Sequence, residues 1–146
     1  MLRSALLATI VTAGLVSAAS AAPPTRFSAA LDGKAEVPPK PGSGFGDALA
    51  TLDPKTKVLS YTITFQGLSG PATAAHFHGP ADAGANAGVA VPIGKDPASP
   101  VTGTTTLTDA QIADLEAGKW YVNVHVHTAA NPGGELRGQM KPSMAR

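Results

Sequence analysis

Cysteine is absent from this chain of 146 residues. Its absence excludes disulfide bonds, cysteine nucleophiles and thiolate metal sites, so any metal site must use histidine, carboxylates, methionine or backbone oxygen. Charge is also sparse, because charged residues make up 14% of the chain and the formal net charge is +1. This balance lacks the basic footprint of a nucleic-acid-binding protein. The acidic residues are scattered along the chain and mark no pair of glycosidase carboxylates.

Long apolar runs are lacking too, apart from a short one near the N-terminus. Residues 1–21 have the order of a secretory signal peptide, with a positive charge at Arg3, an apolar stretch and then small residues. Because the stretch is short and rich in alanine, we expect a leader cleaved after Ala21, not a transmembrane span. No membrane span then remains, and the protein is expected to be periplasmic or secreted. The other expected parts are a linker over 22–26, a β domain over 27–141 and a tail over 142–146.

Between its ends the chain has the pattern of an all-β protein. Apolar and polar residues alternate, as in Leu59, Tyr61 and Ile63, which would line one face of a strand. Turn signals recur at short intervals, and Asp53-Pro54-Lys55-Thr56 is expected to join two strands in a hairpin. This pattern predicts an all-β sandwich or barrel, and of these we expect an antiparallel β-sandwich.

One short helix is expected near residues 109–117. Thr108 and Gln111 have the spacing of a capping box, in which each residue satisfies a backbone N–H near the other. Ile112 and Leu115 would face the core, and Gly118 is placed to end the helix.

The histidines form the clearest functional pattern. All four stand in two pairs, His76-Phe77-His78 and His125-Val126-His127. Residues i and i+2 of a strand point to the same face about 7 Å apart, so two such strands side by side would offer four imidazoles to one ion. Imidazole suits zinc, copper, iron and nickel, and copper(II) binds nitrogen sites most tightly of the divalent series. We therefore predict a metal site, with copper as the first choice and zinc as the second. The alternative is ordinary strand histidines that face solvent or form hydrogen bonds.

Three residues near the second pair are candidates for supporting the ligands. If the last two strands form a hairpin, His127 lies opposite Glu135 and His125 opposite Arg137. Glu135 could then accept an N–H from a ligand imidazole, and Arg137 could guide small anions to an open metal position. Asn123 shares the histidine face of its strand. The alternative is an ordinary cross-strand Glu–Arg pair on a solvated sheet.

Several segments, taken together and in order, resemble the CHRD domain. They are Ala75–Ala81, Leu107-Thr108 with Gln111 and Leu115, Gly118–His125, His127-Thr128 and Asn131–Gln139. The similarity covers about Phe27 to Met140. This family is named from chordin, a large extracellular protein that binds growth factors, and occurs in many exported bacterial proteins. We expect an exported, single-domain bacterial member.

The paired histidines also resemble the copper site of copper/zinc superoxide dismutases, in motif and architecture only. The sandwich could accordingly be Greek-key, immunoglobulin-like or dismutase-like. Such dismutases hold zinc with further histidine and aspartate ligands, and this chain has no spare histidine. The comparison therefore argues against a two-metal dismutase and leaves a copper-only site open.

Three functions follow from the sequence. The first is a metal-binding module that carries, buffers or senses copper. The second is a copper-dependent oxidoreductase acting on superoxide or another small molecule, for which no catalytic side chain stands out. The third is an adhesion or interaction module of the cell envelope, with structural histidines. The sequence identifies a metal ion as partner and names no protein partner.

Overall fold

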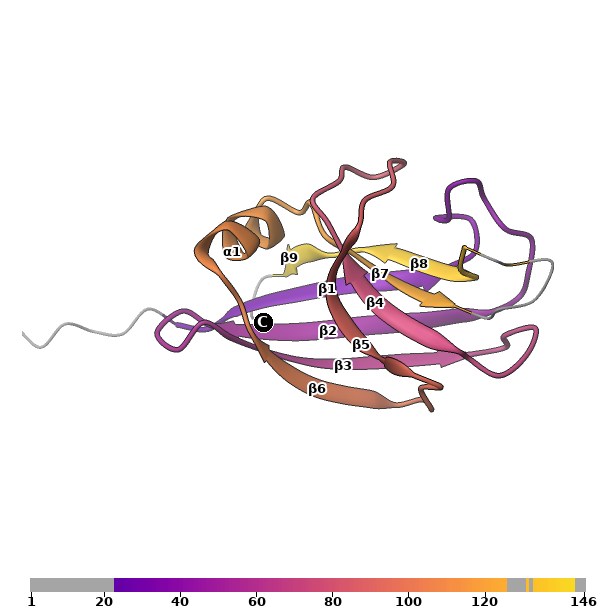
Figure 1. The fold of residues 1–146 in the computed structure, drawn as a ribbon, viewed down its shortest axis with the longest axis horizontal. Coiled ribbons are helices and arrows are strands. Elements are labelled where there is room, and N and C mark those ends of the chain that lie inside the picture. Colours follow the sequence, from indigo (N-terminus) through magenta and orange to yellow (C-terminus); the bar gives the residue numbers. More distant parts are fainter. Residues whose placement is uncertain (1–22, 126–130, 132, 144–146) are drawn as a thin grey trace, which may run out of the picture.

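The computed structural model describes residues 23–125, 131 and 133–143, so the expected signal peptide lies outside the described residues. Figure 1 shows the elements in chain order. They are β1 Thr25–Asp32, β2 Phe45–Asp53, β3 Val58–Gln66, β4 Ala74–His78, β5 Val89–Lys95, β6 Val101–Thr106, α1 Asp109–Glu116, β7 Tyr121–His125, β8 Leu136–Gln139 and β9 Lys141–Ser143. The prediction of an all-β, antiparallel fold with one short helix is confirmed.

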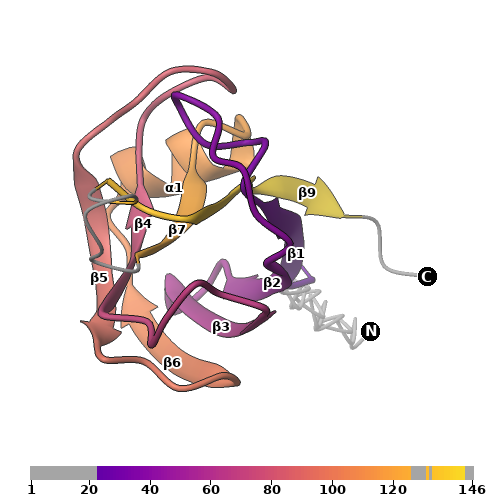
Figure 2. The same ribbon diagram turned by 90° about the vertical axis from the view of Figure 1, so that its right-hand side faces the viewer.

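The strands form one continuous sheet. Its order is β5-β4-β7-β8-β1-β2-β3-β6, and β9 pairs with β1 beside this path. The sheet curls until it is nearly closed, which brings its two halves face to face as in a sandwich (Figure 2). Because β4 and β7 are neighbours in this order, the sheet brings together the two strands that carry the histidine pairs.

The inner face of the curled sheet holds the hydrophobic core. In the hairpin of β2 and β3, alternate residues are buried, including Leu52, Leu59 and Ile63, as the period of a strand requires. The predicted turn closes this hairpin, where the Asp53 carboxylate accepts the backbone N–H groups of Lys55 and Thr56 at 2.8 and 3.2 Å. Aromatic side chains join the two halves of the core, where Phe77 of β4 packs against Tyr61 of β3 and against Trp120.

Helix α1 begins and ends where the sequence indicates. The Gln111 N–H donates to the Thr108 hydroxyl at 3.2 Å, and the Thr108 N–H donates to the Gln111 side chain at 2.9 Å, so the capping box is present. Gly118, with φ +71°, follows the helix. Leu115 is fully buried and anchors the helix to the core, while Ile112 is partly buried against it. No helix among the described residues is long and apolar enough to cross a bilayer.

Two expected boundaries differ from the structure. Thr25 and Arg26, expected in a linker, begin β1, and Pro142 and Ser143, expected in a tail, belong to β9. The cause is pairing, because β9 forms an antiparallel ladder with β1 in which Arg26 faces Ser143. A pairing partner far along the chain turns a polar, proline-containing segment into a strand.

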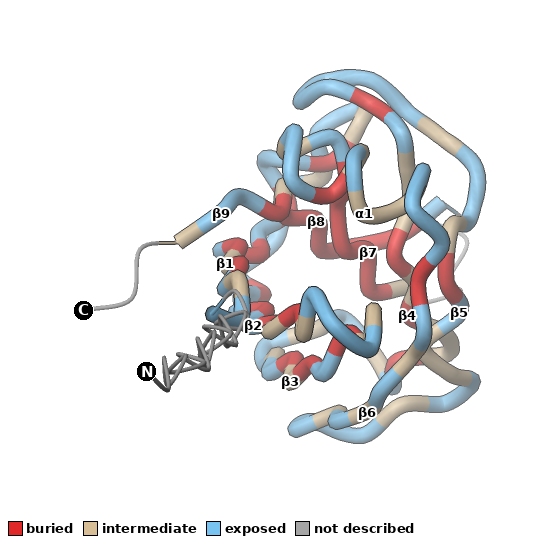
Figure 3. Tube along the Cα trace, turned by 90° about the vertical axis from the view of Figure 1, so that its left-hand side faces the viewer, coloured by how far each residue is buried: buried red, intermediate tan, exposed pale blue. Residues whose placement is uncertain are grey.

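Strands β7 and β8 are buried on both faces. Their residues do not alternate between buried and exposed, unlike those of β2 and β3 (Figure 3). One face packs on the core, and two loops cover the other: residues 33–44 between β1 and β2, and residues 79–88 between β4 and β5. The loops touch each other, since the Asn86 amide donates to the Val37 carbonyl at 3.2 Å. The histidine face is therefore a covered polar layer.

Candidate metal centre

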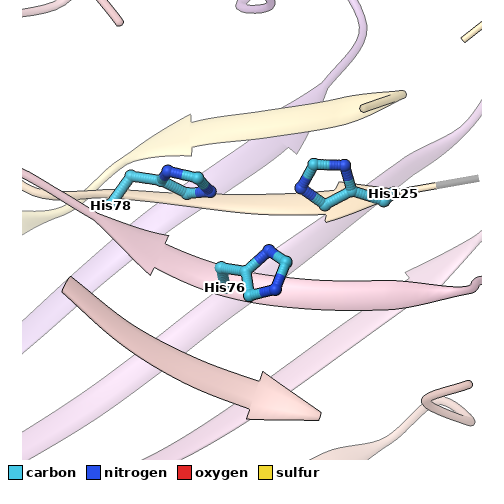
Figure 4. A group of neighbouring side chains, drawn as sticks. All are labelled: His76, His78 and His125. Atoms are coloured by element: carbon cyan, nitrogen blue, oxygen red, sulfur yellow. The ribbon is translucent and has the colours of Figure 1, made fainter. Parts of the chain in front are cut away.

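Three of the four predicted ligands come together on this covered face. In the antiparallel ladder of β4 and β7, His76 is opposite Asn123, His78 is opposite Tyr121 and Ala74 is opposite His125. Alternation places His76, His78 and His125, here called the histidine triad, on one face (Figure 4). Intervening residues such as Phe77 and Val124 are fully buried on the core side.

The triad has a geometry that a metal ion could use. One ring nitrogen of each histidine lies within 4.8 Å of the corresponding atoms of the other two. Ring centroids are 5.0 Å apart for His76 and His125, 5.5 Å for His76 and His78, and 6.2 Å for His78 and His125. Nitrogen ligands of a tetrahedral ion are about 3.3 Å apart, given metal–nitrogen bonds of about 2.0–2.1 Å. The three nitrogens would have to move closer together to bind one ion. His127, the fourth predicted ligand, lies outside the described residues.

His78 has a defined tautomer. Its Nδ1 is 3.1 Å from the carbonyl oxygen of Ala87, and because a carbonyl only accepts, Nδ1 carries the proton. Nε2 is then left with its lone pair, buried and with no hydrogen-bond partner among the described residues. Burial lowers the pKa of His78; the Ala87 bond opposes that effect, and the nearby charges of His76 and Arg137 add to it. A neutral imidazole with an available nitrogen is the form that ligates metals.

Tyr121 fixes the orientation of the same ring. The rings of His78 and Tyr121 stack with centroids 4.8 Å apart and planes within 3°. The Tyr121 hydroxyl accepts from the Ala87 N–H at 3.2 Å and donates to the Ala87 carbonyl at 3.3 Å. Ala87 of the 79–88 loop thus bonds to both His78 and Tyr121, and Tyr121 of β7 stacks on the His78 ring. The sequence did not single out Tyr121 or Ala87 for this role.

The predicted register between the last two long strands is wrong by two residues. Arg137 pairs with Asn123, not with His125, and Leu136 pairs with Val124. A shift of two residues keeps each side chain on its predicted face and changes only its neighbours. No turn motif in the sequence specified this register.

Glu135 and Arg137 are both buried, so the alternative of a solvated Glu–Arg pair is also wrong. The Glu135 carboxylate accepts from the Ser69 N–H at 2.8 Å, the Ser69 hydroxyl at 2.6 Å and the Asn131 amide at 3.1 Å. These bonds tie the chain before β4 to the start of β8. The predicted bond from a ligand imidazole would come from His127, which lies outside the described residues.

Arg137 holds the 79–88 loop. Its guanidinium donates to the Asn86 side chain at 2.9 Å and to the Ala85 carbonyl at 2.6 Å. Its Cζ atom also lies 3.5 Å from the centroid of the Tyr121 ring, a cation–π contact. Tyr121 in turn stacks on His78, so Arg137 contacts the histidine triad only indirectly, through the Tyr121 ring.

Glu36 is a site residue that the sequence analysis missed. It lies in the 33–44 loop, is 6% exposed, and accepts a short hydrogen bond from the Asn123 amide. Burial raises the pKa of Glu36 from its ordinary 4.5 to about 7, against the opposing effects of the Arg137 charge and the Asn123 bond. Asn123, predicted as a supporting residue, also donates to the Leu136 carbonyl at 3.3 Å. Asn123 therefore links the 33–44 loop to the strand that carries His125.

Fold and site together define a small antiparallel β domain with a covered histidine cluster. The chain belongs to the CHRD domain family, whose model matches residues 27–140, which confirms the resemblance noted from the sequence. No curated protein and no solved structure matches the chain. The family assignment by itself says nothing of a metal.

Proposed function

We propose that this domain binds one transition-metal ion through His76, His78 and His125. The observation that carries the proposal is the convergence of three imidazole nitrogens within 4.8 Å from two adjacent strands. The tautomer of His78 adds support, because the Ala87 carbonyl holds the proton on Nδ1 and leaves Nε2 for a ligand bond. His127 is the proposed fourth ligand.

Copper is the proposed ion and zinc the second choice. The chain has no cysteine, so this site would lack the thiolates found in many structural zinc sites. An all-imidazole site binds copper(II) more tightly than the other divalent ions of the first transition row. Adding copper and zinc together in equal amounts would test this order of affinity directly. Preferential retention of zinc would show that zinc is the preferred ion.

A copper(II) titration of the purified full-length protein tests the site. We expect one copper per chain with a type-2 electron paramagnetic resonance signal that shows nitrogen coupling. The double variant His76→Ala/His125→Ala should weaken copper binding by more than about a hundredfold. Removal of a residue that only hydrogen-bonds to a metal ligand typically weakens metal binding by about 10–100-fold. Thr104→Ala on the edge strand β6 is the control, and His127→Ala tests the fourth ligand separately.

Two outcomes would remove the proposal. One is the absence of a stoichiometric signal from the wild-type protein. The other is unchanged copper affinity in the double variant, with circular dichroism showing that it is folded. Either result would leave the histidines as structural residues of an interaction domain.

A cavity beside His78 favours redox chemistry as a second candidate function. This cavity has a volume of about 200 Å³ and also includes Tyr121 and Asn123 in its lining. A copper-dependent oxidoreductase needs such space for a small substrate such as superoxide. Superoxide removal by the copper-loaded protein, compared with the same amount of free copper, tests the idea. A rate no higher than that of free copper would reject it.

We also propose that the protein is exported to the periplasm or the medium. The support is the charged, apolar and small-residue order of residues 1–21. Mass spectrometry of protein recovered from the native cell envelope or medium should give a mature N-terminus at Ala22. An intact N-terminus on protein recovered from the cell interior would contradict export.

A further inference from the structure

The cavity beside the histidine triad is built by both covering loops and by strands β4 and β7. Its volume is about 200 Å³, below the roughly 300–1,000 Å³ of pockets that take drug-sized ligands. Its lining includes Glu36, His78, Asn86, Tyr121 and Asn123. An occupant of this cavity must therefore consist of a few heavy atoms.

The hydrogen-bond donors of three lining side chains already have acceptors within the protein. His78 Nδ1 and the Tyr121 hydroxyl both donate to the Ala87 carbonyl, at 3.1 and 3.3 Å. The Asn86 amide donates to the Val37 carbonyl at 3.2 Å. These side chains are therefore occupied in holding the two loops and the ring of His78 in place.

Asn123 instead offers an acceptor to the cavity that it lines. Its Nδ2 donates to the Glu36 carboxylate and to the Leu136 carbonyl, and because a carbonyl only accepts, these bonds fix which end of the amide is nitrogen. Its Oδ1 is buried and has no hydrogen-bond partner among the described residues. The other such atom of the lining residues is Nε2 of His78, which the proposed function assigns to the metal. Buried polar atoms are nearly always bonded, so Oδ1 indicates a hydrogen-bond donor in the cavity.

We propose that this cavity admits a small neutral molecule that binds the metal through a lone pair and donates a hydrogen bond to Oδ1 of Asn123. The inference rests on the proposed metal function and deepens it by naming the class of the exogenous ligand. A cation would be repelled by the metal ion, and an anion without a donor would set its lone pairs against Oδ1 and the Glu36 carboxylate. Asn123 thus determines specificity, because a buried acceptor disfavours any ligand that leaves it unbonded.

Three azoles, added to the copper-loaded, full-length protein, test the proposal. Pyrazole carries a lone pair next to an N–H group, and 1-methylpyrazole has a methyl group in place of that hydrogen. A third azole, 4-methylpyrazole, has the same additional methyl group but keeps the N–H. Titration at pH 8, above the Glu36 pKa of about 7, keeps that carboxyl group an acceptor, and the visible absorption of copper(II) reports binding.

We expect pyrazole and 4-methylpyrazole to bind at least about fivefold more tightly than 1-methylpyrazole, the factor that one ordinary hydrogen bond contributes. Each ratio is taken relative to the same ratio for copper(II) in solution. Asn123→Ala removes the acceptor, so its ratios should fall to those of copper(II) in solution. Glu36→Ala is the matched control, because it breaks the same bond between Asn123 and Glu36 but leaves Oδ1 in place, so the preference should remain.

The outcomes separate this inference from the proposed function. Stoichiometric copper in the wild type, with equal relative affinities for the three azoles or with no azole binding, would overturn the inference and leave the metal site standing. Loss of the preference in Glu36→Ala as well as in Asn123→Ala would also overturn it, because the preference would then depend on the 33–44 loop. If Asn123→Ala does not fold, the comparison of the three azoles on the wild type decides. If the wild type binds no copper, the proposed function fails first and the inference fails with it.

Discussion

The buried carboxyl group of Glu36 makes the stability of the metal-free protein depend on pH. Its pKa is about 7 in the folded protein and about 4.5 when exposed in the unfolded chain. Between these values the folded state holds a proton that the unfolded state has lost, so stability falls as pH rises through this window. Glu36→Gln removes this dependence, because its amide keeps the shape and the acceptor for Asn123 but does not ionise.

The size of the effect follows from the two pKa values. Each pKa unit corresponds to about 1.36 kcal/mol, so the change from 4.5 to about 7 costs the wild type about 3 kcal/mol of unfolding free energy above pH 7. We therefore expect Glu36→Gln to be about 3 kcal/mol more stable than the wild type at pH 8. The two proteins should have nearly equal stability near pH 4.5.

Urea unfolding with a chelator present, at several pH values from 4.5 to 8, measures this difference. Trp120 is the only tryptophan of the chain and is fully buried, so its fluorescence reports unfolding. The pKa of His78 is lowered in the folded protein, so His78 makes stability rise as pH increases toward 6.5. This effect is opposite in sign to that of Glu36. Both proteins share that contribution, which cancels in the comparison. Parallel stability curves for the two proteins would refute the reasoning.

Three further substitutions test other parts of the structure. Gly134→Ala should cost about 1–3 kcal/mol in urea unfolding, because φ is +127° and the new Cβ would overlap the Asn123 amide; an unchanged midpoint would contradict this. Phe77→Ala should cost about 3–5 kcal/mol, because the side chain is fully buried on the core side. A loss under 1 kcal/mol would count against this packing. Tyr121→Phe keeps the stack on His78 but loses the bonds to Ala87, so we expect about 1 kcal/mol lower stability and less than a tenfold change in copper affinity. A loss of copper binding there would instead assign the hydroxyl to the metal.

Much of the local structure could be predicted from the sequence. Alternation predicted the β2–β3 hairpin, and the capping residues Thr108 and Gln111 predicted where α1 begins. Both depend on neighbours a few residues apart, where periodicity and backbone capping decide the outcome. The same reasoning put His76 and His78 on one face of a strand, since that follows from the geometry of any strand.

Only the tertiary structure decided which segments meet. The adjacency of β4 and β7, which brings His125 to the first pair, comes from antiparallel pairing between strands that are far apart along the chain. The register of β8 against β7, mispredicted by two residues, was set by a strand pairing that no motif in the sequence specifies.

The residues that cover the histidine face also depended on the tertiary structure. Glu36 is 87 residues from its partner Asn123, and nothing near it in the sequence marks it as a site residue. The sequence alone determined the strand-forming pattern, the paired imidazoles and the lack of thiolates. The fold determined that the loops over residues 33–44 and 79–88 cover the histidine face, and burial lowers the pKa of His78 and raises that of Glu36. Desolvation depends on what covers a group, and the strand that packs against Glu36 is distant from it along the chain.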